Sequence, residues 1–114
     1  MELIEIRSDE VTILQPCGRI DSVGSKPFGD RLAELVHSGS KRLLIDLGQI
    51  PYISSAGFRA LLVARKLIDS ASGKLVLCGM SAEVQRLFEI GAFLELFTVC
   101  ASREDGLSQV RQAG

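Results

Sequence analysis

The chain has 114 residues, of which 46% are hydrophobic, 13 are Lys or Arg and 14 are Asp or Glu. This length suits one domain with a hydrophobic core and is too short for two, so we expect residues 1–114 to form a single domain. The formal net charge of -1 gives no overall attraction to nucleic-acid phosphates, and we expect no nucleic-acid partner.

The sequence also favours a cytoplasmic protein with no membrane contact. No apolar run approaches the roughly 20 residues of a membrane span. The N-terminal segment "MELIEIRSDE" carries acidic residues where a signal peptide would carry positive charge.

Two apolar strands and a helix open the predicted fold. Residues 3–6 and 11–16 flank the polar residues 8–10, a pattern typical of an antiparallel hairpin. The helix that follows has Ser25 as a candidate cap and can end at Gly39. Its apolar residues recur at helical spacing and are Phe28, Leu32, Leu35 and Val36.

Alternating strands and helices fill the rest of the chain. Residues 42–47 and 74–79 are nearly continuous apolar runs, which suit strands covered on both faces. A helix lies between them, and a third helix opens at Ser81, a candidate N-cap. A short strand near residues 97–100 follows, and "SRED" (102–105) matches a capping box that makes Ser102 the candidate cap of a final helix. The order is therefore ββαβαβαβα. Because strand–helix–strand units form parallel crossovers, we expect an α/β fold with helices on a mixed sheet.

The three cysteines favour reduced, buried thiols. Cys17, Cys78 and Cys100 are odd in number and far apart in the sequence. This spacing fits neither a disulfide framework nor the close ligand pairs of a zinc site.

The segment "YISSAGFRALL", residues 52–62, has a simple structural interpretation. Ser54 would be the N-cap of a helix, accepting a hydrogen bond from a free backbone N–H group of the first turn. Gly57 costs a helix about 1 kcal/mol relative to alanine. A glycine in the first turn therefore suggests that another group approaches the helix closely.

An enzymatic interpretation would make Ser55 a nucleophile, because "SAG" supplies half of a G-x-S-x-G elbow. Ile53 occupies the place of the first glycine, and the only candidate base is His37, at the end of the first helix. We therefore expect no catalytic residues and no enzyme. No Gly-rich phosphate loop is present, so we expect no cofactor. We also expect no metal, since the isolated carboxylates suit turns and element ends; they are Asp21, Asp46 and Asp69.

A third interpretation makes a serine the acceptor of a phosphoryl group that another enzyme delivers. If Ser54 is the N-cap, Ser55 is the first helical residue, at a helix end whose N–H groups and dipole favour an anion. Phosphate adds about -1.5 to -2 charges at pH 7 and would change how this surface contacts a partner.

The chain resembles the STAS domain of the anti-sigma factor antagonist family. The resemblance covers nearly the whole chain and rests on "GRID" (18–21), "LLIDLGQIPYISSAGFRALL" (43–62) and "GKLVLCGMSAEVQRLFEIGAF" (73–93). It implies a protein that binds a serine-kinase type anti-sigma factor while unphosphorylated. Phosphorylation by that partner ends the contact, and a serine phosphatase resets it.

The resemblance also implies roles for individual residues. The family's phosphorylated serine falls on Ser55, and Ser54 stands where the family has aspartate. "GRID" places Asp21 in the loop beside the helix start, although a turn carboxylate is an equal alternative. The residues expected to bind the partner or to support the site are Asp21, Ser54, Ala56, Gly57 and Arg59. Two alternatives remain, namely a STAS scaffold or interaction module that is never phosphorylated and, more distantly, a hydrolase.

Overall fold

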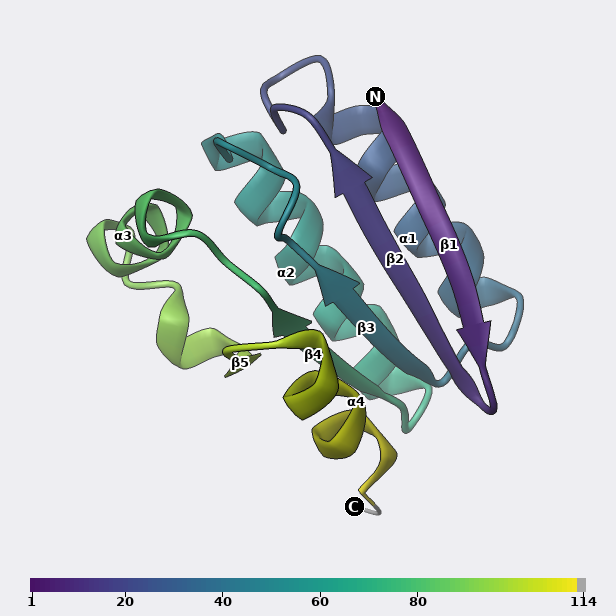
Figure 1. The fold of residues 1–114 in the computed structure, drawn as a ribbon. Coiled ribbons are helices and arrows are strands. Elements are labelled where there is room, and N and C mark those ends of the chain that lie inside the picture. The colour runs from purple at the N-terminus through teal and green to yellow at the C-terminus, as the bar shows by residue number, and fades with distance from the viewer. Residues whose placement is uncertain (113–114) are drawn as a thin grey trace.

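The computed structural model describes residues 1–112, which form a five-stranded sheet with helices on both faces (Figure 1). The strands are β1 (Glu2–Ser8), β2 (Val11–Cys17), β3 (Arg42–Asp46), β4 (Lys74–Cys78) and β5 (Thr98–Cys100). The helices are α1 (Ser25–His37), α2 (Ser55–Ser70), α3 (Ala82–Ile90), the short 3-10 helix η1 (Leu94–Leu96) and α4 (Arg103–Arg111). The predicted α/β class and the order ββαβαβαβα are confirmed, whereas η1 was not predicted.

The sheet has the strand order β1-β2-β3-β4-β5 and is mixed, as predicted. β1 pairs with β2 antiparallel, with Ile6 opposite Ile13. The three remaining pairs are parallel, because a helical segment separates each strand from the next. The carboxyl ends of β2, β3 and β4 therefore meet at one edge of the sheet.

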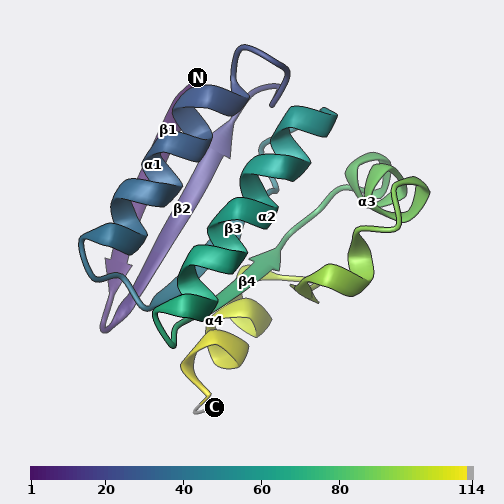
Figure 2. The same ribbon diagram turned by 180° about the vertical axis from the view of Figure 1, so that it is seen from behind.

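The core lies in two clusters, one on each face of the sheet. α1 and α2 cover one face and α4 covers the other (Figures 1 and 2). In β3, Leu43 and Ile45 belong to the larger cluster beneath α1 and α2, whereas Leu44 belongs to the smaller cluster with Val110 of α4. The prediction that the apolar runs of β3 and β4 are covered on both faces is confirmed.

α3 lies to the side of α2, beyond the carboxyl end of β4 (Figure 2). Val84 and Phe88 bury its apolar face in the larger cluster. The ring of Phe58 in α2 packs edge to face on Phe88, with 4.7 Å between centroids, and stacks on Phe93 at 4.3 Å. These aromatic contacts hold the segment after β4 against the first turns of α2.

Three of the four predicted helix caps are present. The side chains of Ser54, Ser81 and Ser102 each accept a hydrogen bond from a backbone N–H group of the first turn. The prediction for Ser25 is wrong, because its backbone N–H already donates to the Asp21 carbonyl at 2.9 Å. The helical pattern thus begins before Ser25, and Gly24 is the N-cap.

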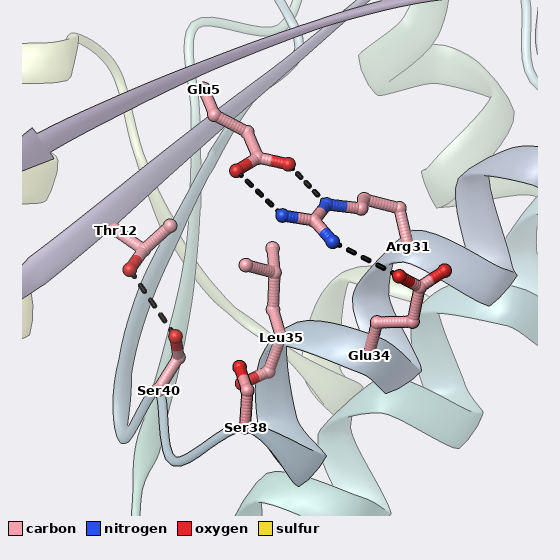
Figure 3. A network of polar contacts seen from close by, with 7 residues as sticks. All are labelled: Glu5, Thr12, Arg31, Glu34, Leu35, Ser38 and Ser40. Carbon is pink, nitrogen blue, oxygen red and sulfur yellow. Dashed lines mark hydrogen bonds and ion pairs between the residues drawn. The ribbon is translucent and has the colours of Figure 1, made fainter.

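Polar contacts hold the edge strand β1 and the end of α1 in place (Figure 3). The Arg31 guanidinium donates to both carboxylate oxygens of Glu5, with Nη2 2.9 Å from Oε2, and it also pairs with Glu34 at 3.1 Å. The hydrogen bond from Arg31 lowers the pKa of Glu5. The hydroxyls of Thr12 and Ser40 are 3.4 Å apart and join β2 to the loop after α1.

All three cysteines are free thiols. Only Cys78 is buried, whereas Cys17 and Cys100 are half-buried, so the prediction of burial is correct for one thiol. Within residues 1–112, no helix combines the length and the apolar character needed to cross a membrane.

Candidate functional site

The candidate site forms where the loop after β3 enters α2, at the edge of the sheet where the parallel strands end. Ile53 makes an isolated parallel bridge to Ile20 in the loop after β2. The backbone of Ile20 accepts a hydrogen bond from Ser54 N at 2.8 Å, and its N–H donates to Tyr52 O at 3.0 Å. Residues 18–24 are therefore held alongside the start of α2.

Ser54 ends the extended segment and caps the helix. Its backbone is extended, with φ -90° and ψ 172°, and its hydroxyl accepts a hydrogen bond from Gly57 N at 3.3 Å. Its side chain is half-buried. The hydroxyl of Ser54 thus has a structural task in the unmodified protein.

Ser55 is the first residue of α2 and is exposed. Arg59, one helical turn later, is also exposed, and Ala56 is half-buried. The first turn of α2 contains no acidic residue. The Ser55 side chain thus lies on an accessible surface where the backbone N–H groups and the helix dipole favour negative charge.

Gly57 is explained by the core of this chain. A Cβ atom at this position would lie 2.6 Å from Ile53 Cγ1 and 2.8 Å from Ile20 Cγ2. The glycine predicted that another group approaches the helix closely, and that group is the pair of isoleucine side chains, Ile20 and Ile53, that form the bridge. Because Gly57 is buried, it supports the site from beneath and is not part of its surface.

Asp21 acts as a turn carboxylate, one of its two expected roles. Its Oδ1 accepts hydrogen bonds from Gly24 N at 2.8 Å and from Val23 N at 3.1 Å. The hydrogen bond from Gly24 is the main reason that the pKa of Asp21 is lowered. Asp21 thus stabilises the loop that contains Ile20, whose backbone is hydrogen-bonded to Ser54 at the start of α2.

Sequence reasoning missed Arg19 and Tyr52, which lie side by side next to the serines. The Arg19 guanidinium is 4.3 Å from the centroid of the Tyr52 ring, within the range of a cation–π contact. Arg19 precedes Ile20 and Tyr52 precedes Ile53, so the bridge between the two isoleucines brings Arg19 and Tyr52 together. The sequence does not show this contact, because it depends on the pairing of two segments that are far apart in the chain. Exposed Arg19 adds a positive charge near the start of α2.

The other chemistries considered for this chain find little support in the geometry. His37 ends α1 next to the start of β3, at the opposite end of the sheet from Ser55, so the two cannot form a nucleophile–base pair. Residues 1–112 contain no group of three or more His, Cys, Asp or Glu side chains placed to hold a metal ion.

Two comparisons of the sequence with known proteins identify the same family. The family model described as the STAS domain matches residues 4–106. A Bordetella bronchiseptica protein, BtrV, named as a candidate anti-sigma factor antagonist, is 35% identical over 113 residues, which cover 99% of this chain and 97% of that protein.

Solved structures agree in fold. A candidate anti-sigma factor antagonist from Thermotoga maritima superposes with a TM-score of 0.90 at 18% identity, covering 96% of this chain and 95% of that one. The Bacillus cell fate determinant SpoIIAA in its phosphorylated form gives a TM-score of 0.73 at 13% identity, covering 96% and 100%. The chain therefore belongs to the STAS domain family, and its resemblance to the anti-sigma factor antagonists of that family is confirmed.

Proposed function

We propose that this protein is an anti-sigma factor antagonist that is controlled by phosphorylation of Ser55. The single observation that carries the proposal is the contrast between the exposed Ser55 and the adjacent Ser54, whose hydroxyl is engaged as a cap. The description of BtrV and the phosphorylated form of SpoIIAA support the same conclusion by family relation.

In this proposal a serine-kinase type anti-sigma factor is both the binding partner and the modifying enzyme. The Ser55 Oγ attacks the γ-phosphorus of ATP in the partner's site, the bond to the ADP leaving group breaks, and the hydroxyl proton is released. This chain contributes an accessible hydroxyl at a capped helix start and leaves the catalysis to its partner. A serine phosphatase would return Ser55 to its free form.

Phosphorylation would act through charge at the interface. The phosphate adds about -1.5 to -2 charges, which the first-turn N–H groups can stabilise without unfolding the helix. Arg59, four residues later, is spaced to pair with the phosphate and would then be withdrawn from the partner. In the complex, negative charge that the partner surface leaves uncompensated costs on the order of 2 to 5 kcal/mol, which is at least a tenfold loss of affinity.

The main alternative is a STAS interaction module that is never phosphorylated. Incubation with the candidate kinase and ATP, followed by mass spectrometry, separates the two functions. We expect one added phosphate on Ser55, with Ser54→Ala still modified and Ser55→Ala unmodified. A phosphate on Ser54, or none on any serine, would contradict the proposal.

Titration calorimetry with the anti-sigma factor then tests the switch. The unmodified protein and Ser55→Ala should bind, the phosphorylated protein should lose at least tenfold in affinity, and Ser55→Asp should lose less because its charge is smaller. Circular dichroism of each form provides the control for folding. Unchanged affinity after phosphorylation, or loss of the folded spectrum along with the affinity, would exclude an interface switch.

A further inference from the structure

Two of the three free thiols lie opposite each other in the sheet. In the parallel pairing of β4 with β5, Cys78 is the direct register partner of Cys100. Side chains of directly paired residues point to the same face of a sheet. Both cysteines indeed contact the smaller core cluster, on the face that α4 covers.

The spacing of paired strands suits a disulfide bond. Neighbouring strands lie about 4.8 Å apart, and the Cα atoms of a disulfide are usually about 4.4–6.8 Å apart. The pairing continues past the cysteines, since Gly79 N donates to Cys100 O at 3.3 Å. The backbone therefore already holds the two Cα atoms at a distance that a disulfide can bridge.

The surroundings of the two thiols differ. Cys78 is fully buried beneath α4, where a Cβ atom on Gly106 would come within 3.2 Å of the Cys78 Cβ, whereas Cys100 is half-buried in the short edge strand. Burial, followed by the nearby Asp46 carboxylate, raises the pKa of Cys78 to about 12, and burial also raises the pKa of Cys100. An oxidant from solvent should thus reach Cys100 first, and the reaction should be slow because little thiolate is present.

We propose that Cys78 and Cys100 form an oxidation site, at which a peroxide converts the thiol pair to an intramolecular disulfide. The Cys100 sulfur attacks the peroxide oxygen and becomes a sulfenic acid as the first water leaves. The Cys78 sulfur then attacks the Cys100 sulfur, forming the S–S bond and releasing a second water. Two thiols and one hydrogen peroxide give one disulfide and two waters, so two electrons pass from sulfur to oxygen.

Such a bond would close the segment from Gly79 to Val99 into a covalent loop. This segment contains α3 and η1, and its Phe88 and Phe93 contact Phe58 in the first turns of α2. The disulfide would tie the three-residue edge strand β5 covalently to β4, its only neighbour among the described strands. The site does not depend on phosphorylation of Ser55, and its test needs no partner protein.

The test uses Cys17→Ser as the background, because Cys17 lies on β2, two strands away from β4. The folded protein is treated with hydrogen peroxide, remaining thiols are alkylated, and the intact mass is measured. We expect a monomer that has lost two hydrogen atoms and accepts no alkylating agent, and a reductant should restore both thiols.

Tryptic mapping locates the bond, since Cys78 lies in peptide 75–86 and Cys100 in peptide 87–103. The two peptides should be joined after oxidation and separate after reduction. The Cys17→Ser, Cys100→Ser variant is the matched control and should form no intramolecular bond. Alkylation of both cysteines after native oxidation, or further oxidation of Cys100 without joined peptides, would overturn the proposal. Oxidation of the same background in urea shows that the reagents can form the bond.

Discussion

At the scale of single residues, the two serines at the start of α2 differ in what surrounds them. The Ser54 hydroxyl accepts from Gly57 N, whereas Ser55 is exposed on the first turn. We expect Ser54→Ala to lower the free energy of unfolding by about 0.5–2 kcal/mol, the usual cost of a lost N-cap. Ser55→Ala should stay within about 0.5 kcal/mol of the wild type. Urea denaturation measures both, and equal losses would contradict the assignment of the cap.

Gly57 shows how tertiary packing can reverse a helix preference. Alanine would gain about 1 kcal/mol in an open helix, but here its Cβ would overlap the side chains of Ile53 and Ile20. Such overpacking typically costs about 1–3 kcal/mol. We therefore expect Gly57→Ala to lower the melting temperature.

Gly29 in α1 is the matched control for Gly57. A Cβ atom there would lie 3.3 Å from the Ala60 Cβ, a milder contact than either isoleucine contact at Gly57. Gly29→Ala should be the more stable of the two variants. If both substitutions stabilise the protein equally, the steric explanation of Gly57 is wrong.

At the scale of elements, the edge strand β1 is held to α1 by the ion pair between Glu5 and Arg31. Because the pKa of Glu5 is lowered in the folded state, the pair stabilises the protein above the ordinary carboxyl pKa of about 4.3. This contribution is lost as the pH falls through the lowered pKa of the folded state. The side chains are 28% and 35% exposed, so we expect it to be at most about 1 kcal/mol.

Glu5→Gln tests this dependence on pH. The wild type should lose more stability than Glu5→Gln between pH 7 and pH 3, because the variant has already lost the ionic contribution. Glu10→Gln, which removes an exposed carboxylate from the hairpin turn, controls for the change in net charge. Urea midpoints that fall in parallel for the wild type and Glu5→Gln would contradict the role of the ion pair.

At the scale of the whole molecule, stability depends on both faces of the sheet. Leu44 is fully buried in the smaller cluster, beneath the turn of α4 that contains Gly106. We expect Leu44→Ala to lower the free energy of unfolding by about 2–5 kcal/mol, through lost burial and the cavity left behind. Val63→Ala, on the outer side of α2 where Val63 is 50% exposed, should have little effect. Similar losses for the two variants would show that the α4 face adds little to the core.

The family and the element order could be predicted from the sequence because their signals are local. The spacing of Phe28, Leu32 and Leu35 marks the buried side of α1, and the apolar run of β3 marks a strand covered on two sides. Ser54, Ser81 and Ser102 could be assigned as caps because each bonds to a residue three positions ahead. Such interactions depend on neighbours in the chain, and a sequence displays those directly.

Tertiary structure alone decided the features that join distant segments. The contact of Arg19 with Tyr52, the isoleucines that exclude a side chain at Gly57, and the pairing of Cys78 with Cys100 all depend on which strands and loops become neighbours. Ser25 is not a cap because its backbone N–H donates to the Asp21 carbonyl, in a turn that the Asp21 carboxylate also holds. The helical hydrogen-bond pattern therefore begins before Ser25. Residues far apart in the sequence meet only when the sheet register and the helix packing are fixed. Local sequence patterns do not determine that register, so these contacts could not be predicted from them.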